Sequence, residues 1–368
     1  MANVSMNDFR AEPEELVRAE VAACERVIRS GWWVLGKEVS AFESEWAQRL
    51  EVPHVVGCGN GMDAIELGLR ALGVGAGDEV VTTPMTAFAT VLAVLRAGAV
   101  PVLADIDAET AMLDPDSVRR CIGPRTRAIV LVHLYGQLGP LDRLAGLAHE
   151  FGIHLIEDCA QAHGASWQGR QAGSFGAFAA WSFYPTKNLG AVGDGGALST
   201  QSADLAVKVR ALRNYGQTVR YHHPLLGMNS RLDEIQAAIL RERMAFLDGW
   251  TKRRREIASA YTQGITHAAI RLLPLPAERQ RHVHHLFVVA CAQRDLLAIH
   301  LKNSGVDSLI HYPIPIHHQD ACRDILRDPV GLARAEAHSA ACLSLPCHPA
   351  MTDLQIKQVI AAANAFKS

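Results

Sequence analysis

The sequence has no long uninterrupted apolar run and no marked excess of charge of one sign. Its most apolar stretch, residues 85–104, is interrupted by Arg96 and Pro101, which predicts buried globular structure rather than a membrane span. The formal net charge is −2 over 368 residues, so nothing in the composition indicates a nucleic-acid or membrane partner. Residues 1–15 are polar and acidic and do not read as a secretory signal, so we expect a cytoplasmic protein.

Paired cysteine motifs are also missing. The chain has 8 cysteines and no CxxC pair, which argues against a disulfide framework or a zinc site and predicts reduced thiols. Several histidines lie in the C-terminal third, namely His282, His284, His285, His317 and His318. Because no carboxylate or cysteine completes an obvious ligand set in the sequence, we expect no metal.

Short apolar stretches alternate with amphipathic stretches over much of the chain. Strands and helices are predicted in alternation at residues 79–83, 87–96, 100–104, 114–122, 128–132, 141–151 and 154–157. This pattern is typical of an α/β fold with a parallel sheet covered on both faces, whose ligands bind beyond the carboxyl ends of the strands. We predict a large, mostly parallel α/β domain over residues 1–250 and a smaller C-terminal α+β domain over residues 251–368.

A glycine turn, Gly59-Asn60-Gly61-Met62, leads into an amphipathic helix. The free amides and positive dipole end of such a helix suit a phosphate group. The turn is not a dinucleotide fingerprint, because position 62 is methionine where that motif has glycine, and it is not a P-loop, because no GK[ST] follows. The alternative is that Asn60 is simply the N-cap of the helix.

Two further groups have chemistry that fits the same site. Lys187 lies between an aromatic lead-in and a glycine-rich exit, and a lysine in a tight, partly apolar turn has a lowered pKa that makes it a nucleophile toward an aldehyde. Asp158 stands at the end of a predicted strand, where a protonated pyridine nitrogen could pair with it. Each residue has a simpler interpretation: Lys187 could be a surface lysine, and Asp158 could be an N-cap. Together with the glycine turn, however, the two residues provide the groups that bind pyridoxal phosphate.

Two other segments carry aromatic side chains. The stretch after residue 213 is long and polar and contains Tyr215, Arg220, Tyr221 and His222, so we expect it to bind a ligand or a second subunit. For the adjacent Trp32 and Trp33, we favour packing against the main domain over contact with substrate.

The chain resembles the sugar aminotransferases of the DegT/DnrJ/EryC1/StrS group, which have the aspartate aminotransferase fold (fold type I). The resemblance runs from about residue 31 to residue 346. It rests on the motifs Gly59–Ala64, His133–Gly136, Glu157–Gly164, Ser182–Gly190, Asn229–Asp233 and His311–Pro313.

The resemblance implies a role for each matching residue. Lys187 holds pyridoxal phosphate through an imine and then carries the proton between substrate and cofactor, Asp158 keeps the pyridine nitrogen protonated, and Gln161 contacts the ring hydroxyl. An aromatic residue usually stacks on the ring in this family. This chain has Ala87 at that position and Phe88 one place later, so Phe88 is the candidate.

The phosphate is expected to bind the backbone of Gly61 and Met62 and the hydroxyl of Ser182. Asn229 of a neighbouring subunit would also reach it, which implies a homodimer with shared active sites. Candidates for substrate contact, chosen by polarity and loop position, are His163, Tyr184, Tyr215, Arg220, Tyr221, His222, Tyr312 and His317.

The motifs most resemble enzymes that aminate a dTDP-linked 3-keto-6-deoxyhexose with L-glutamate as donor. The alternatives are amination at C4, a UDP-sugar substrate, or a non-catalytic regulatory partner of the same fold. A dehydrase of this fold would have histidine at the position of Lys187, and a regulator would have lost Lys187, Asp158 or the glycine turn.

Overall fold

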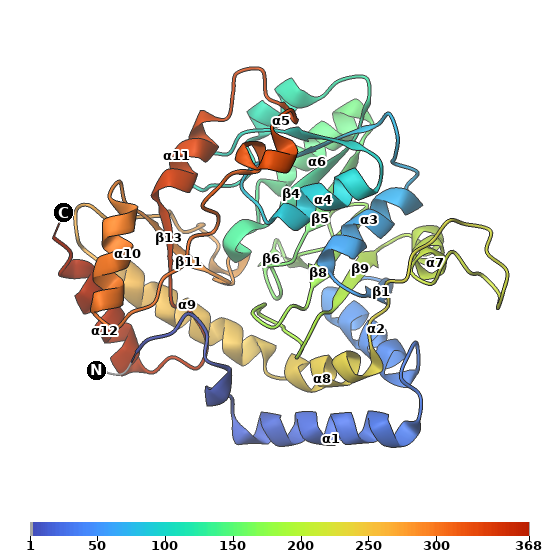
Figure 1. The fold of residues 1–368 in the computed structure, drawn as a ribbon, viewed down its shortest axis with the longest axis horizontal. Coiled ribbons are helices and arrows are strands. Elements are labelled where there is room, and N and C mark those ends of the chain that lie inside the picture. The colour runs from blue at the N-terminus through green and yellow to red at the C-terminus, as the bar shows by residue number, and fades with distance from the viewer. Residues whose placement is uncertain (1–2, 368) are drawn as a thin grey trace.

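The computed structural model describes residues 3–367, and a single sheet of 8 strands forms its centre, in the order β1-β9-β8-β5-β4-β2-β3-β12 (Figure 1). Its strands are β1 (His54–Cys58), β2 (Glu79–Thr82), β3 (Val100–Leu103), β4 (Thr126–Val132), β5 (His154–Asp158), β8 (Phe178–Ser182), β9 (Gly196–Thr200) and β12 (Leu326–Arg327). The six strands from β8 to β12 are mutually parallel, whereas β9 runs antiparallel to both β8 and β1. The predicted mostly parallel α/β sheet is therefore confirmed.

Helices cover both faces of this sheet, so the strands bury the side chains that point to either face. Ile129 and Leu131 of β4 pack into one apolar cluster, and the alternate residues Ala128 and Val130 pack into another. Helices α2, α5 and α6 contribute to the first cluster, and α3, α4 and α7 contribute to the second. The helices are α2 (Lys37–Leu50), α3 (Gly61–Ala71), α4 (Phe88–Arg96), α5 (Pro115–Cys121), α6 (Leu141–Phe151) and α7 (Ala203–Leu212).

A second, smaller sheet has the order β10-β11-β13, with strands at Arg271–Leu272, Phe287–Ala290 and Cys342–Leu345. Its apolar cluster is shared with α9 (Leu247–Gly264), α10 (Arg294–Asn303) and α12 (Asp353–Asn364). The remaining helices are α1 (Glu14–Ser30), α8 (Glu234–Met244) and α11 (Ala333–Ala341), and β6 (Ser166–Trp167) and β7 (Arg170–Gln171) form a hairpin. Single 3-10 turns occur at Phe9–Ala11, Leu134–Gly136, Arg279–Arg281, Ile316–His318 and Asp320–Cys322.

The division of the chain at residue 250 stays a prediction, and the structure shows two segments that cross it. Val4 forms a parallel bridge with Val306 and is buried in the same cluster as the smaller sheet. In the opposite direction, β12 of the C-terminal part adds to the edge of the large sheet beside β3. Residue 250 itself lies inside the continuous helix α9.

The segment before His311 is not a strand, and Leu309 contributes only an isolated bridge to Ser344. One local expectation was wrong. Trp32 and Trp33 are 63% and 60% exposed, so they do not pack against the main domain of their own chain.

All eight cysteines are free thiols. Within residues 3–367, none of the helices combines the length and the apolar character that a membrane crossing needs.

Candidate active site

Lys187 lies in the loop between β8 and β9, at the carboxyl edge of the large sheet. Two backbone hydrogen bonds close the loop, from Phe183 N to Gly195 O (2.8 Å) and from Ala191 N to Phe183 O (2.7 Å). Gly190 is required in this turn, since a Cβ there would lie 2.4 Å from the carbonyl oxygen of Pro185. The glycine-rich exit seen in the sequence therefore fixes the position of the lysine.

Loss of hydration lowers the pKa of Lys187 to about 8, although the negative charge of Asp158 acts in the opposite direction. Such an amine is partly neutral near physiological pH and can attack an aldehyde or accept a proton. Burial, together with the charge of Lys187, lowers the pKa of both His163 and His285, so these rings stay neutral beside it. The lysine predicted from the sequence thus has the electrostatic character that imine formation needs.

Asp158 is the last residue of β5 and pairs with Ala180 of β8, two residues before Ser182. The sheet therefore brings this carboxylate to the same edge as the lysine loop. The side chain is 7% exposed, and both of its oxygens accept hydrogen bonds. Oδ2 accepts from Thr90 Oγ1 (2.8 Å), and Oδ1 accepts from the amide of Ala160 (3.1 Å).

The N-terminus of α3 lies directly against Ser182. Asn60 is its N-cap, and its side-chain oxygen accepts from Asp63 N (2.9 Å) while its carbonyl accepts from Ala64 N (3.1 Å). Among the described residues, none accepts a hydrogen bond from the amides of Gly61 and Met62, which are left for a ligand. A Cβ on Gly61 would lie 2.8 Å from the Cβ of Ser182, so only glycine allows this approach. The capping and phosphate interpretations are compatible.

The side chain of Gln161 forms hydrogen bonds with Tyr135 of the large-sheet region and with Tyr312 of the C-terminal region. Its Oε1 accepts from the amide of Tyr135 (2.5 Å), and its Nε2 donates to the hydroxyl of Tyr312 (3.3 Å). The Tyr135 hydroxyl in turn donates to the carbonyl of His311 (2.6 Å) and lies 2.9 Å from Nε2 of His338. The predicted cofactor residue Gln161 and the predicted substrate residue Tyr312 are thus brought together.

These groups fit pyridoxal phosphate. The uncapped amides beside Ser182 suit its phosphate, the buried carboxylate of Asp158 suits a protonated ring nitrogen, and the amine of Lys187 suits its aldehyde. Phe88 begins α4 and packs on a cluster formed by Val91, Leu103, Ile316, Cys322 and Leu332. Its stacking role stays a prediction.

Two of the predicted substrate residues are enclosed in this chain. His163 is 0% exposed and is surrounded by the rings of Trp46, Trp181 and Phe183, with ring centroids 5.2 Å from that of Trp181. In this chain the His163 ring therefore packs among aromatic side chains, and its contact with a substrate stays a prediction. His317 is also buried and lies 3.0 Å from the carboxylate of Glu336.

Carboxylates do complete two histidine groups that the sequence did not reveal. His317, His318 and Glu336 place ligand-type atoms close together, as do His133, Glu157 and Cys159. Each group contains a hydrogen bond between a histidine and a glutamate. In the second group, His133 Nε2 lies 3.1 Å from Glu157 Oε2. In addition, Glu157 accepts from the amides of residues 173, 175 and 176. These bonds give both groups a structural role, and the absence of a metal stays a prediction.

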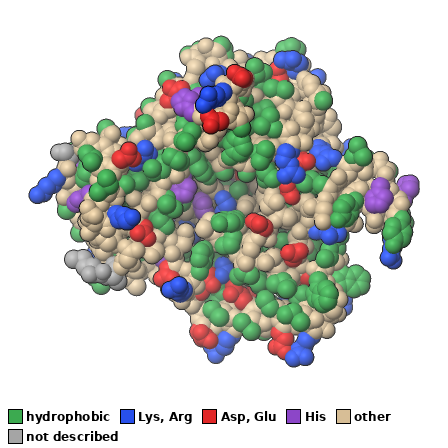
Figure 2. Space-filling model, viewed as in Figure 1, with side chains coloured by type: hydrophobic (Ala, Val, Ile, Leu, Met, Phe, Trp, Pro, Cys, Tyr) green, Lys and Arg blue, Asp and Glu red, His purple; other side chains and the backbone are tan. Residues whose placement is uncertain are grey.

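The predicted polar loop projects from the body of the molecule beside α7 (Figure 1), and it carries apolar, basic and histidine side chains (Figure 2). Tyr215 is 49% and Tyr221 80% exposed, and the guanidinium of Arg220 lies 5.0 Å from the Tyr221 ring centroid. His222 is exposed at the same tip. Asn229 closes the base of the loop by a bridge to Asn214. None of these side chains lines the cavity beside Lys187 in its own chain.

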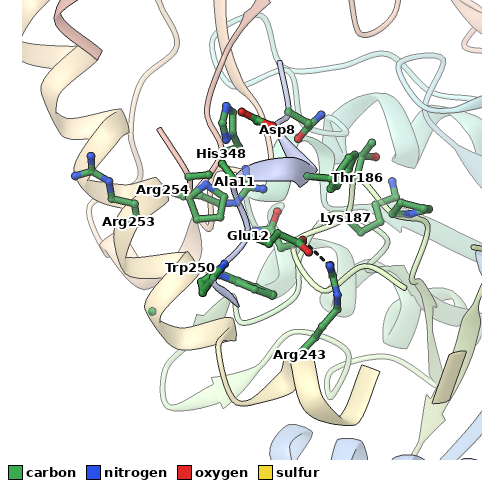
Figure 3. Close-up of a pocket in the computed structure, with 18 residues that line it drawn as sticks. Asp8, Ala11, Glu12, Thr186, Lys187, Arg243, Trp250, Arg253, Arg254 and His348 are labelled. Carbon is green, nitrogen blue, oxygen red and sulfur yellow. Dashed lines mark hydrogen bonds and ion pairs between the residues drawn. The ribbon is translucent and has the colours of Figure 1, made fainter. Parts of the chain in front are cut away.

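Sequence reasoning missed the residues that hold this loop base and the lysine loop. Ser230 accepts a hydrogen bond from Gly59 N (3.0 Å) and donates to Asp63 (2.7 Å), which joins the loop base to the glycine turn. A cavity of about 310 Å³ lies beside Lys187, and Glu12 and Arg243 also line it (Figure 3). The pairing of Arg243 with Glu12, 231 residues earlier, had no local signal in the sequence.

Tyr184 is 52% exposed and its amide bonds to the hydroxyl of Ser182 (3.4 Å), so it lies at the surface of the lysine loop. Its carbonyl oxygen accepts a hydrogen bond from the amide of Lys187 (2.8 Å), so this predicted substrate residue lies in the same turn as the lysine. The roles of the individual site residues remain proposals.

Comparison with known proteins agrees with this arrangement. The model of the DegT/DnrJ/EryC1/StrS aminotransferase family matches residues 14–364. The chain is 45% identical over 359 residues to dTDP-3-amino-3,4,6-trideoxy-alpha-D-glucose transaminase of Streptomyces venezuelae, covering 98% of this chain and 95% of that protein. It is 40% identical over 356 residues to UDP-N-acetyl-3-dehydro-alpha-D-glucosamine 3-aminotransferase of Acidithiobacillus ferrooxidans, covering 97% and 96%.

The fold is likewise that of a solved aminotransferase. The crystal structure of S. venezuelae DesV in complex with a ketimine intermediate superposes with a TM-score of 0.95 at 44% identity, covering 99% of this chain and 98% of that one. The predicted aspartate aminotransferase-like fold and its cofactor are therefore confirmed. The chain belongs to the DegT/DnrJ/EryC1/StrS aminotransferase family and is a pyridoxal-phosphate-dependent sugar-nucleotide aminotransferase.

Proposed function

We propose that this enzyme transfers the amino group of L-glutamate to C3 of a dTDP-3-keto-6-deoxyhexose, in the biosynthesis of a deoxyaminosugar for a cell-surface glycan or a natural product. The observation that carries the proposal is the convergence of Lys187, Asp158 and the N-terminus of α3 on one sheet edge. The S. venezuelae relative supports the choice of a dTDP-linked sugar, because its name states that nucleotide and the 3-amino product.

Pyridoxal phosphate supplies an aldehyde that accepts the amino group and a ring that withdraws electrons from the bond to be broken. Lys187, with its pKa lowered to about 8, acts as the base that takes a proton from the α-carbon of glutamate and later delivers one to the sugar carbon. Asp158 would hold the proton on the ring nitrogen, and Gln161 would contact the side of the ring that carries the hydroxyl. The amides of Gly61 and Met62, with the hydroxyl of Ser182, would hold the phosphate.

A homodimer with shared active sites is part of the proposal. Asn229 lies at the base of a loop that projects from the body, and Tyr221 at its tip is 80% exposed. A projecting polar loop of this kind suits contact with a second copy, where Arg220, Tyr221 and His222 would meet the sugar nucleotide. The exposed Trp32 and Trp33 supply apolar surface for the same association. We propose that the protein works in the cytoplasm, where its eight free thiols would remain reduced.

The proposal is tested in two stages with purified protein. First, the visible absorbance band of the bound cofactor is recorded before and after addition of L-glutamate, with Lys187→Ala as the control that cannot form the imine. The band should be lost on adding glutamate in the wild type only. Second, dTDP- and UDP-linked 3-keto and 4-keto sugars are compared by kcat/KM. A wild type whose band is unaffected by glutamate would refute the donor, and preference for a UDP or 4-keto sugar would refute the acceptor.

A UDP-sugar acceptor is the second candidate, favoured by the A. ferrooxidans relative at 40% identity. A non-catalytic regulatory role is disfavoured because Lys187, Asp158 and the glycine turn are all present.

A further inference from the structure

Two threonines form a hydrogen-bonded chain that ends on Asp158. Thr90 Oγ1 lies 2.8 Å from Oδ2 of Asp158, and Thr86 Oγ1 lies 2.8 Å from Thr90 Oγ1. Thr86 stands just before α4 and Thr90 lies in its first turn, so one short segment supplies both hydroxyls. Neither residue belongs to the motifs on which the family resemblance rests.

The direction of each bond follows from the chemistry of the groups. A carboxylate only accepts, so the single hydroxyl proton of Thr90 is donated to Asp158. Thr90 then has only lone pairs to offer, so Thr86 must donate to it. The chain therefore runs from Thr86 to Thr90 to Asp158, and its last bond is charge-assisted, which makes it the stronger of the two.

All three side chains of this hydrogen-bonded chain are buried from solvent. Thr86 is 4%, Thr90 1% and Asp158 7% exposed, so a hydroxyl lost from this chain could not readily be replaced by solvent. The other carboxylate oxygen of Asp158 is held by the amide of Ala160 at 3.1 Å. With one bond to each oxygen, the plane of the carboxylate is fixed, while lone pairs on it remain free for a further donor.

We propose that Thr90 is a positioning residue for the reaction: it sets the orientation in which Asp158 meets the ring nitrogen of the cofactor, and Thr86 orients Thr90. The inference rests on the proposed role of Asp158. A carboxylate held in place before the cofactor arrives needs no reorganisation when the ring binds or when charge develops on it.

The test is a mutant cycle read by cofactor affinity as well as by rate. Thr90→Val keeps the shape and removes the hydroxyl, Thr90→Ser keeps the hydroxyl, and Asp158→Asn removes the charge that Thr90 serves. For each protein, the dissociation constant of pyridoxal phosphate is measured by titrating the apoprotein, and the rate of the half-reaction with glutamate is measured by stopped flow. We expect Thr90→Val to weaken binding and slow the half-reaction by about tenfold, and Thr90→Ser to recover most of both.

The mutant cycle shows whether Thr90 acts by orienting Asp158 or only by packing. If Thr90 acts through Asp158, Thr90→Val should change the dissociation constant by less than about twofold when Asp158→Asn is already present. An undiminished tenfold effect in that background, or a Thr90→Ser protein as impaired as Thr90→Val, would overturn the inference. An Asp158→Asn protein with wild-type affinity and rate would instead refute the role of Asp158 itself.

Thr86→Val serves if Thr90→Val does not fold, because it leaves the bond to Asp158 in place and removes only the outer donor. We expect a two- to threefold loss of affinity, reversed in Thr86→Ser, since a neutral hydrogen bond is worth less than a charge-assisted one. Equal affinity in Thr86→Val and the wild type would contradict the outer step of the chain.

Discussion

The guanidinium of Arg243 in α8 binds the carboxylate of Glu12 at the start of the chain, with Nη2 2.5 Å from Oε1. The same side chain binds Glu20 of α1 through Nε (2.5 Å) and the carbonyl oxygen of Gly190 through Nη1 (3.2 Å). Because Gly190 closes the turn that carries Lys187, one buried arginine joins the N-terminal segment to the loop that holds this lysine. Figure 3 shows Arg243 and Glu12 on the wall of the cavity that Lys187 also lines.

Removing this arginine is expected to be costly. The Arg243 side chain is 6% exposed, and Arg243→Met leaves the carboxylates of Glu12 and Glu20 without their partner. Breaking a buried ion pair from one side typically destabilises a protein by about 3 kcal/mol or more. Urea unfolding of the apoprotein measures this loss.

The matched control is Arg119→Met, which breaks an ion pair with Glu150 whose side chains are 52% and 50% exposed. Solvent screens a surface pair of this kind, so Arg119→Met should lower the free energy of unfolding far less than Arg243→Met does. Equal destabilisation by the two substitutions would contradict a special role for Arg243.

The lowered pKa of Lys187 predicts how cofactor attachment depends on pH. The rate at which apoprotein forms its visible band with pyridoxal phosphate should rise as the amine loses its proton, with a midpoint near pH 8. An exposed lysine, represented by N-acetyl-lysine, should give a midpoint near its ordinary pKa of about 10.4. A midpoint of the protein reaction above pH 10 would show that Lys187 is not desolvated.

The charge of Asp158 predicts the direction in which its removal should shift the pKa of Lys187. Its negative charge favours the protonated lysine and so raises the pKa of Lys187 against the effect of burial. Asp158→Asn should therefore move the midpoint to lower pH. A shift to higher pH would contradict the electrostatic arrangement at this sheet edge.

Sequence reasoning found the parts of the site that depend on local signals. The helix at Gly61–Ala71, the strand ending at Asp158 and the glycine-rich loop around Lys187 each follow from spacing, capping and turn residues within a short segment. The α/β alternation then predicted that strand ends would bring them together, which the parallel pairing of β5 with β8 confirms.

The parts that sequence reasoning missed depend on tertiary contacts. The two residues of β12 are too few to show periodicity, and they pair with a strand more than 200 positions earlier in the chain. His163 looked accessible because it is polar, but its aromatic neighbours Trp46 and Trp181 come from distant segments. The exposed Trp32 and Trp33 reverse the usual tendency of tryptophan to be buried in its own chain.

Gly61 is expected to tolerate no side chain. In Gly61→Ala, the new Cβ would lie 2.8 Å from the Cβ of Ser182 and 3.3 Å from its backbone, so the start of α3 must shift from the phosphate site. We expect the dissociation constant of pyridoxal phosphate to rise by at least about tenfold, as misplacement of a helix N-terminus weakens its bonds to an anion.

Gly146→Ala in α6 is the matched control, because its Cβ would meet nothing within 4 Å and alanine favours a helix. Its affinity for the cofactor should equal that of the wild type, and its unfolding temperature should not fall. A Gly61→Ala protein with unchanged affinity would refute the phosphate site at α3.

Shared active sites can be tested by complementation. If the proposal is right, each site combines Lys187 of one subunit with Asn229 and Tyr221 of the other. Lys187→Ala protein and Asn229→Ala/Tyr221→Ala protein should each be nearly inactive alone. After the two are dissociated and mixed in equal amounts, half of the dimers should be mixed, and each of these has one intact site, so activity should return to about a quarter of the wild-type value.

The control for this experiment mixes Lys187→Ala with Asp158→Ala, since both residues lie at the edge of the same sheet in one chain. In a mixed dimer of these two, each site lacks one essential group, so no activity should return. Recovery in the control mixture would mean that Lys187 and Asp158 of one site come from different subunits, against their placement at one sheet edge of a single chain. Failure of the first mixture to recover, with mixed dimers demonstrated by mass spectrometry, would show that Asn229 and Tyr221 act within their own chain.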